Sequence, residues 1–308
     1  MSQRRLRVAV IAEEAAGVQV LQGLSALETS PEIVAVLTRS AAEGAERPVV
    51  YESARKLGLE LWPSSSVRSP DLAAQLRSAD VDLLVNVHSL FLIHPFVLAA
   101  PKIGSFNLHP GPLPEYAGLN APSWAIYRGE SSHGVTLHWM DEGIDTGPIA
   151  WRTRFPIDGA DTGLSLSAKC VRNGVPLVLR LATVAAKDPQ AIPREDQELS
   201  RRAYFSAGPP AEGGIDWAQP ADAILRFVRA ADYAPFDSPW GHPHAQLAGR
   251  SVGLAKATAT GMAAADAPGT VAESNESGAV VATGDQLILI QRLWLNGRYL
   301  KPSEFLGD

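Results

Sequence analysis

Short β-rich runs alternate with helical stretches through the first half of the chain, and this alternation constrains the fold more than any other feature. The runs at 5–12, 32–39 and 81–87 read RLRVAVIA, EIVAVLTR and VDLLVNV, which are patterns of buried strands. Between them, residues 18–27 have helical spacing and residues 69–79 predict a serine-capped helix. Strands that alternate with helices form a parallel sheet with helices on both faces. We therefore predict an α/β fold with a mostly parallel sheet.

The chain then continues towards a group of polar residues. A hydrophobic helix is predicted at 92–100 and a strand at 103–109, which ends in Asn-Leu-His. Alternating strands are predicted at 134–140 and 147–157, with the acidic loop DEGIDT between them. In open α/β sheets, ligands bind beyond the carboxyl ends of strands. The ends of these strands are therefore the expected place for a site.

The last third of the chain differs in composition. A long helix is predicted at 162–185, and charged residues, proline and glycine are frequent after it. A helix starting near Gln219 follows, and the runs GLAKAT, GAVVAT and QLILIQRLWL then predict strands. We predict a catalytic domain at 1–190, a linker at 191–213 and a small β-rich domain at 214–308.

Charge and cysteine content narrow the functional classes. Lys and Arg number 27 against 33 Asp and Glu, a net charge of −6, which disfavours generic binding to nucleic acid. The single cysteine, Cys170, cannot form an internal disulfide, so a reducing cytoplasm is expected and Cys170 is predicted to be a small buried residue. The first apolar run ends at Glu13 and Glu14 and is too short for a signal peptide or a membrane span.

Asn107 and His109 are the strongest candidates for chemistry. Because side chains alternate along a strand, an amide donor and an imidazole would face one small volume. Histidine exchanges protons near neutral pH and an amide N–H stabilises a developing oxyanion, so the pair suits attack on a carbonyl. Asp141, Glu142 and Asp145 in the acidic loop are candidates for a carboxylate beside the imidazole. The alternative is that these are ordinary turn residues at a strand end.

The other histidines have weaker claims. His88 and His94 flank the segment after the strand at 81–87, where they could touch a ligand or serve the turn and core. His138, on an alternating strand, is predicted to be packed or to support the site indirectly. His242 and His244 look like a metal pair, but no carboxylate or cysteine completes a set at ligand spacing. We expect no metal there and interpret this segment as an aromatic-rich ordered loop.

A series of motifs connects the chain to a known family. The family pattern runs Asn-x-His, a Leu-Pro turn ending in Gly, Trp-Ala-Ile before Gly-Glu, Gly-Val-Thr before His, and Asp-x-Gly. The same motifs occur here in order, at Asn107, His109, Leu113, Pro114, Gly118, Trp124, Ala125, Ile126, Gly129, Glu130, Gly134, Val135, Thr136, His138, Asp145, Thr146 and Gly147. Weaker similarity extends from residue 5 to the end. The chain resembles the folate-dependent formyltransferases, which include methionyl-tRNA formyltransferase and sugar N-formyltransferases.

The resemblance implies a fold and a site. It implies a Rossmann-like formyltransferase domain followed by a β-rich, OB-like C-terminal domain, with Asn107, His109 and Asp145 as the catalytic residues. It also implies that 10-formyltetrahydrofolate donates the formyl group. Two segments, largely through their backbone groups, would bind this co-substrate: Ser89, Leu90, Phe91, Leu92 and Ile93 in one, and Asp141, Glu142 and Gly143 in the other.

Two departures from the family pattern concern the acceptor. The family commonly has serine where Gly111 stands and a basic residue where Ala117 stands. The stretch from His109 to Glu130 is closer to formylation domains of peptide-synthesising assembly lines than to the tRNA enzyme. We therefore expect a small-molecule amine acceptor in specialised metabolism: an amino acid, a hydroxyornithine, an amino sugar or a carrier-bound aminoacyl group.

Three other functions stay open. Methionyl-tRNA formylation is the nearest, but residues 205–308 hold seven Lys or Arg against eleven Asp or Glu, whereas a tRNA platform should be basic. A folate-binding protein without catalysis is the second, against which the presence of all three catalytic residue types speaks. A nicotinamide oxidoreductase is the third, and residues 8–17 lack the G-x-G-x-x-G turn that it would need. The sequence alone fixes no oligomeric state.

Overall fold

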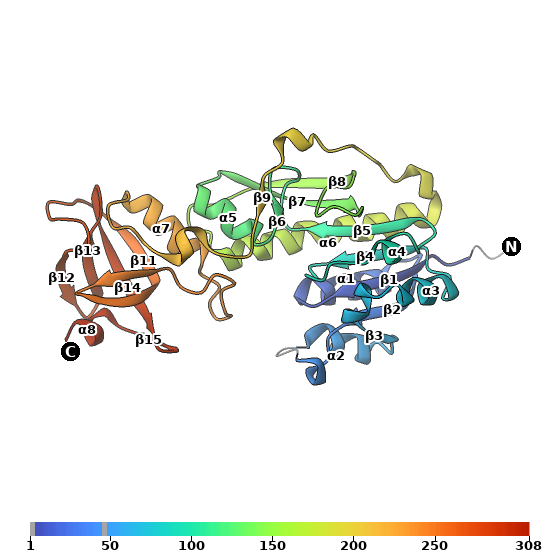
Figure 1. Cartoon of the computed structure of the whole chain (residues 1–308), viewed down its shortest axis with the longest axis horizontal. Helices are drawn as coiled ribbons and strands as arrows, with labels where there is room; N and C mark the ends of the chain where they lie inside the picture. Colours follow the sequence, from blue (N-terminus) through green and yellow to red (C-terminus); the bar gives the residue numbers. More distant parts are fainter. Residues whose placement is uncertain (1–3, 45–47, 308) are drawn as a thin grey trace. The chain divides into compact units, whose positions relative to one another are not determined.

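A seven-stranded sheet forms the centre of the first part of the protein (Figure 1). The computed structural model describes residues 4–44 and 48–307. The strand order is β3-β2-β1-β4-β5-β7-β8; β1 to β5 run parallel and β7 runs antiparallel to β5, which confirms the mostly parallel α/β prediction. The strands are β1 (Arg7–Ala12), β2 (Glu32–Thr38), β3 (Leu61–Pro63), β4 (Leu83–Val87), β5 (Gly104–His109), β7 (Ser132–Trp139) and β8 (Ile149–Pro156).

Helices cover both faces of this sheet because its strands are apolar on both sides. One core joins Val8, Val10 and Leu108 to the helices α1 (Ala15–Ala26), α2 (Val49–Lys56) and α6 (Gly163–Lys187). The other core joins Ile11, Leu37 and Leu84 to α3 (Asp71–Ser78) and α4 (Pro95–Leu98). Cys170 on α6 is 1% exposed within the first core, as the sequence predicts.

Two helices differ from their predictions. The helix predicted at 92–100 is only the four-residue α4, because Pro95 occupies its first turn and the exposed residues before it are irregular. The helix predicted as serine-capped begins at Asp71 with Pro70 in the cap position; Ser69 Oγ still accepts a hydrogen bond from the Asp71 N–H, at 3.2 Å. The helix α2 and the strand β3 were not predicted.

An antiparallel sheet forms the centre of the second part. The order β10-β11-β14-β13-β12, with β15 also paired to β14, confirms the predicted β-rich domain. The core of this part is built from apolar side chains of the sheet and of α7 and α8. The elements are α7 (Ala221–Ala230), β10 (His244–Leu247), β11 (Arg250–Ala263), β12 (Val271–Asn275), β13 (Gly278–Ala282), β14 (Gln286–Leu295), β15 (Arg298–Leu300) and α8 (Pro302–Leu306).

The two compact units are interleaved along the chain. The first contains 1–117, 134–155 and 169–204, and the second contains 118–133, 156–168 and 205–308. The helix α5 (Ala121–Arg128) therefore belongs to the second unit, where its Trp124 packs edge-on against Trp240, with ring centroids 4.9 Å apart. Two short strands, β6 (Ala117–Gly118) and β9 (Tyr204–Phe205), pair where the chain passes between units. The boundaries predicted at 190 and 214 do not coincide with this division and stay a prediction.

Among the described residues, none of the helices combines the length and the apolar character needed to cross a membrane.

Candidate active site

Asn107 and His109 lie at the carboxyl end of β5, as the sequence predicts. β5 lies between β4 and β7, and its pairing places Asn107 opposite Asn86 on one side and His138 on the other. His109 lies opposite Thr136. Because side chains alternate along a strand, polar groups from three neighbouring strands project on one face of the sheet.

Asp145 reaches this group from the loop between β7 and β8. Its Oδ2 lies 3.6 Å from His109 Nδ1, and its Oδ1 lies 3.5 Å from His138 Nε2 and 3.3 Å from Asn107 Nδ2. The side chain of Asp145 is only 9% exposed. The structure thus brings Asp145, which is distant in sequence, together with Asn107 and His109. Three nitrogen atoms surround the carboxylate at distances longer than those of good hydrogen bonds, as is common in active sites without substrate.

The backbone fixes the orientation of the His109 ring. Its Nε2 lies 2.6 Å from the carbonyl oxygen of Tyr116. A carbonyl oxygen can only accept a hydrogen bond, so Nε2 carries the hydrogen and donates. Nδ1 is therefore the nitrogen that faces Asp145, and when the ring is protonated Nδ1 donates towards the carboxylate. The ring is 3% exposed and its rotation is restricted by this contact.

The amide of Asn107 is hydrogen-bonded at both ends. Its Nδ2 lies 3.1 Å from His138 Nε2, and its Oδ1 accepts a hydrogen bond of 2.9 Å from Asn86 Nδ2. His138 Nδ1 lies 2.7 Å from the carbonyl oxygen of Trp139, so Nδ1 donates and, in the neutral ring, Nε2 accepts. The buried His138 thus contacts Asn107 directly, and its predicted role in supporting the site stays a prediction. Sequence reasoning missed Asn86, although a polar residue within the buried run LLVNV was a signal.

Thr136 holds the loop that follows His109. Its buried Oγ1 donates to the carbonyl oxygen of Gly111 at 2.8 Å and accepts from the N–H of Leu113 at 3.1 Å. One hydroxyl group thus satisfies two backbone groups that the turn would leave unpaired. This contact explains why threonine stands opposite His109 in the Gly-Val-Thr motif.

The loop carrying Asp145 has a defined internal structure. Asp141 Oδ1 accepts hydrogen bonds from the Gly143 N–H at 3.1 Å and from Thr146 Oγ1 at 2.7 Å. Asp145 itself has a φ of +55°, a left-handed conformation that is uncommon for a residue with a side chain. At Gly147, a Cβ atom would collide with the carbonyl group of Trp139, so only glycine fits. The exposed carboxylate of Asp141 therefore shapes the turn, and its predicted contact with the co-substrate stays a prediction.

Two residues of the predicted linker hold the same loop. Gln197 Nε2 donates to the carbonyl oxygens of Asp145 at 3.0 Å and Gly147 at 2.7 Å. Arg202 donates to the carbonyl oxygen of Ile144 at 2.9 Å. Sequence reasoning missed both residues, since nothing in a proline-rich charged stretch indicates which loop it contacts. The segment up to Tyr204 belongs to the first unit, and it fixes the backbone from which Asp145 projects.

The segment Ser89 to Ile93 follows β4 and presents apolar side chains to the surface. Leu90 is 76% exposed and Leu92 is 70% exposed, whereas Ser89 is buried. Phe91 packs on the second core and lies under the guanidinium group of Arg68, 4.7 Å from the ring centroid. An exposed pair of leucines at the carboxyl edge of the sheet suits a flat, partly apolar ligand.

His88 and His94 flank that segment and differ in environment. His88 directly follows β4 and has a left-handed φ of +59°. Burial, and secondarily the nearby His109, lower the pKa of His88 to about 4, which keeps its ring neutral at neutral pH. His94 instead caps α4, and its Nδ1 accepts from the N–H of Phe96 at 3.2 Å. His94 is thus occupied in local structure.

His242 belongs to an aromatic cluster in the second unit. Its ring centroid lies 5.1 Å from that of Trp294 and 5.5 Å from that of Tyr299. Burial lowers the pKa of His242 below its ordinary value. Within residues 4–44 and 48–307, no three His, Cys, Asp or Glu side chains are grouped so that they could hold a metal ion.

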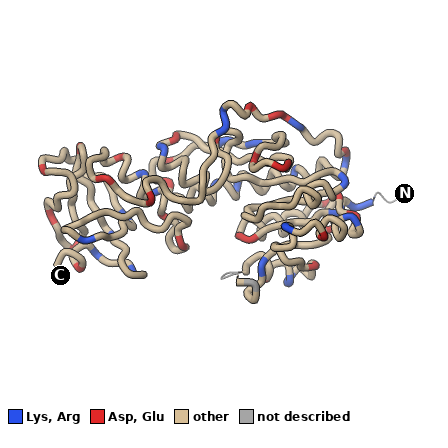
Figure 2. Tube along the Cα trace, in the orientation of Figure 1, with Lys and Arg blue, Asp and Glu red and all other residues tan. Residues whose placement is uncertain are grey.

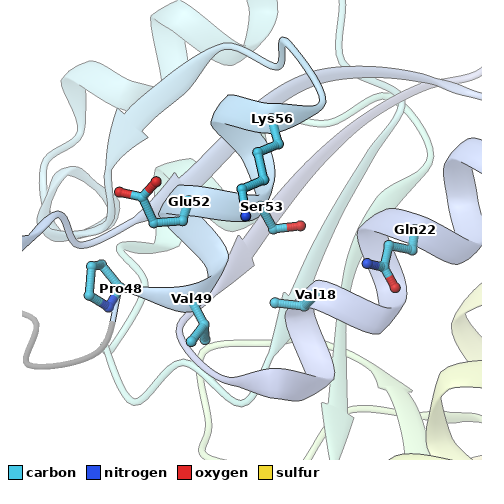
Figure 3. A pocket seen from close by; sticks show the side chains of 7 residues that line it. All are labelled: Val18, Gln22, Pro48, Val49, Glu52, Ser53 and Lys56. Atoms are coloured by element: carbon cyan, nitrogen blue, oxygen red, sulfur yellow. The ribbon is translucent and has the colours of Figure 1, made fainter.

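A surface hollow of about 370 Å³ lies between α1 and α2 (Figure 3). Its lining combines apolar and polar side chains: Val18, Gln22, Pro48, Val49, Glu52, Ser53 and Lys56. It contains no histidine, and none of the polar side chains described above lines it. We assign the candidate active site by the chemistry of Asn107, His109 and Asp145 and not by this hollow.

The fold and these residues define a class of protein. Residues 6–180 match the family described as formyl transferase, and residues 209–307 match the formyl transferase C-terminal domain. The chain belongs to the formyl transferase family. It is similar to a protein named methionyl-tRNA formyltransferase from Pseudomonas fluorescens strain SBW25, with 32% identity over 280 residues, 89% of this chain and 85% of the relative. A relative of the same name from Stenotrophomonas maltophilia strain K279a is 32% identical over 297 residues, 93% of each chain.

Solved structures share the fold at lower identity. An N-formyltransferase from Helicobacter canadensis, in complex with folinic acid and dTDP-3-aminofucose, superposes with a TM-score of 0.68 at 19% identity, over 93% of this chain and 99% of that chain. HypX from Aquifex aeolicus, in complex with tetrahydrofolic acid, gives 0.65 at 20% identity. The alignment with HypX covers 99% of this chain but 47% of HypX, so the present chain spans about half of that protein. At these identities the likeness establishes the fold.

Proposed function

We propose that this protein transfers a formyl group from 10-formyltetrahydrofolate to the amine of a small acceptor. The observation that carries this proposal is the arrangement of Asn107, His109 and Asp145 at the carboxyl end of β5. An amide donor, an imidazole and a carboxylate within contact distance suit acyl transfer to an amine. Membership of the formyl transferase family supports the same reaction.

The chemistry follows from the orientation of these groups. The acceptor nitrogen attacks the formyl carbon, and the carbonyl oxygen becomes negative in the tetrahedral intermediate. Asn107 Nδ2 and protonated His109 Nδ1, which face Asp145 in the free protein, turn their hydrogen bonds to this oxygen when the substrate is bound. Asp145 organises removal of the proton from the attacking amine. When the carbon–nitrogen bond to the folate N10 breaks, that nitrogen takes up one proton. The amine has released one proton, so the reaction is balanced.

Two features suit the folate co-substrate. The exposed Leu90 and Leu92 offer an apolar surface, and the ordered turn from Asp141 to Asp145 offers backbone groups beside the reacting atoms. These are the two segments to which we assign co-substrate binding, with Ser89, Phe91 and Ile93 in the first and Glu142 and Gly143 in the second. Solved structures of the same fold in complex with tetrahydrofolic acid and folinic acid support a folate co-substrate.

The charge of the C-terminal part supports a small acceptor. Residues 205–308 carry seven Lys or Arg and eleven Asp or Glu, and Figure 2 shows the two signs interspersed along this part of the chain. A surface that binds tRNA needs an excess of positive charge to replace counterions on phosphates. We propose a free or carrier-bound amine in specialised metabolism as the acceptor, and a cytoplasmic location, which the single cysteine supports.

Formylation of methionyl-tRNA is the second candidate. Its support is the 32% identity to proteins of that name over 89% or more of this chain. This function requires a tRNA-binding surface that does not depend on an excess of positive charge in the C-terminal part, because that part is acidic. A folate-binding protein without catalysis is disfavoured, because all three polar groups are present and oriented.

One experiment separates these functions. The protein is incubated with 10-formyltetrahydrofolate and, separately, with amino acids, hydroxyornithine, nucleotide amino sugars, carrier-bound aminoacyl groups and charged initiator tRNA. Release of tetrahydrofolate is followed by absorbance, and the formylated product by mass spectrometry. We expect transfer to one of the small amines and none to tRNA. Transfer to tRNA alone would replace the proposed acceptor, and folate binding without transfer to any acceptor would overturn the proposed enzyme activity.

A further inference from the structure

Asn86 is a buried amide in the middle of an apolar sheet. It lies on β4 between Val85 and Val87, and it is 8% exposed. It projects on the same face as Leu84, two residues earlier, which belongs to the apolar core under α3. A valine or leucine would pack in this position without the cost of burying an amide. Packing therefore gives no reason for an asparagine here.

The hydrogen bonds of Asn86 have a fixed direction. Its side chain lies 3.1 Å from the carbonyl oxygen of Ser89. Because that oxygen can only accept, the atom of Asn86 that faces it is the nitrogen, Nδ2. The second hydrogen of Nδ2 then points to Asn107 over 2.9 Å, so the atom of Asn107 on this side is the oxygen.

The hydrogen bonds on the other side of Asn107, at His138, give the same orientation of the Asn107 amide independently. The carbonyl oxygen of Trp139 accepts from His138 Nδ1 at 2.7 Å, which leaves Nε2 of a neutral His138 ring as an acceptor. The atom of Asn107 that faces it at 3.1 Å must then be the nitrogen. Two backbone carbonyl groups, one on each side of β5, thus impose one orientation on the Asn107 amide.

We propose that Asn86 is a positioning residue that holds the Asn107 amide with its NH₂ group towards Asp145 and the reacting carbonyl. Without a donor at position 86, the Asn107 oxygen loses its partner and the amide can rotate. A rotated amide presents an oxygen lone pair where the oxyanion develops, which repels it. The consequence for catalysis rests on the proposed formyl transfer, whereas the orientation of the amide does not.

The unpartnered atoms nearby agree with this role. Asn86 Oδ1 is buried and makes no hydrogen bond with any of the described residues, and the same is true of Ser89 Oγ. A residue selected for its own stability would not bury an acceptor without a partner. By contrast, both hydrogens of Asn86 Nδ2 are used, one towards Ser89 and one towards Asn107.

The variant Asn86→Asp tests the direction of the hydrogen bond. It has nearly the same shape but, when ionised, presents only acceptors, so it forces Asn107 to turn its nitrogen towards residue 86 and its oxygen towards His138. His138 Nε2 must then carry a hydrogen to remain paired. With ¹⁵N-labelled histidine, we expect the Nε2 resonance of His138 to move from that of an unprotonated to that of a protonated nitrogen. This readout needs no enzymatic activity.

Kinetics supply the second readout. Once the amine acceptor is known, Asn86→Asp should lower kcat about a hundredfold and Asn86→Val about tenfold, each with KM changed less than threefold. Asn173→Asp is the matched control: Asn173, on α6, bonds the carbonyl oxygen of Lys169 outside the site, and kcat should stay unchanged. Melting temperatures identify any variant that fails to fold.

Each result decides between the alternatives. An unchanged His138 resonance in a folded Asn86→Asp protein would overturn the proposed positioning. If that variant does not fold, Asn86→Val replaces it: wild-type kcat would contradict the proposal, and a loss of kcat at constant KM supports it. If the wild type transfers formyl groups to no amine, the proposed function fails, and the His138 resonance still tests the role of Asn86.

Discussion

We propose that Asn107, His109 and Asp145 act as one unit, because the carboxylate of Asp145 faces both of the other side chains. Asp145 Oδ2 lies 3.6 Å from His109 Nδ1, and its Oδ1 lies 3.3 Å from Asn107 Nδ2. The carboxylate faces both donors and, in the proposed reaction, organises proton removal.

The double variant of His109 and Asp145 tests this coupling. We expect His109→Ala and Asp145→Asn each to slow formyl transfer about a hundredfold or more, and the double variant to be scarcely slower than the worse single variant. The measurement is single-turnover transfer at saturating co-substrate and amine for all four proteins. Losses that multiply would show that the two residues act independently.

His88 should make the protein sensitive to acid. The folded-state pKa is about 4 and the ordinary value is 6.5, so the unfolded state binds the proton first as pH falls. The stability associated with neutral His88 is complete above pH 6.5 and is lost progressively down to pH 4. Asparagine tolerates the left-handed conformation, so His88→Asn should keep the backbone.

The measurement for His88 is urea unfolding at pH 7 and pH 5. The loss of stability between these values should be smaller in His88→Asn than in the wild type, by about 1–2 kcal/mol. Comparing the change with pH, and not the absolute stability, removes the effect of altered packing. Equal losses in both proteins would contradict the lowered pKa.

At the scale of elements, the segment from residue 188 to residue 203 holds the loop that carries Asp145. The side chain of Gln197 bonds two carbonyl groups of this loop, and Arg202 bonds a third. Because Asp145 has a left-handed backbone conformation, the loop depends on contacts from outside to hold it.

Gln197→Glu should therefore lower kcat about tenfold, since a carboxylate has the same shape but cannot donate to the two carbonyl groups. Gln190→Glu is the matched control in the same segment, where only the backbone N–H of Gln190 makes a hydrogen bond that is described. Steady-state kinetics and melting temperatures of both variants are the measurements. Equal activity in the two variants would show that Gln197 does not position the loop.

Local patterns predicted the parts of the site that belong to strands. The alternation of strands and helices predicted the parallel sheet, and the period of two placed Asn107 and His109 on one face of β5. Asn86 and Gln197 could not be found in this way, because their roles depend on register between strands and on a contact across 52 residues. The predicted length of the helix at 92–100 was wrong, because the apolar residues after β4 are exposed and not helical.

At the scale of the whole molecule, the charge distribution predicts the class of acceptor. The acidic C-terminal part should not bind charged initiator tRNA at physiological salt. Fluorescence anisotropy with labelled tRNA between about 50 and 200 mM salt measures this. The Stenotrophomonas maltophilia relative serves as the positive control. Tight binding that weakens steeply with salt would favour tRNA as the acceptor.

Single-turnover formyl transfer by wild type and His109→Ala tests the central claim most directly. Enzyme saturated with 10-formyltetrahydrofolate, labelled in its formyl group, is mixed with the amine identified in the acceptor assay. We expect the label to move to the amine in the wild type, and to move about a hundredfold or more slowly in His109→Ala. The two proteins should bind tetrahydrofolate with nearly equal affinity. Transfer at the wild-type rate by His109→Ala would contradict the proposed site, and the absence of transfer by the wild type would contradict the proposed reaction.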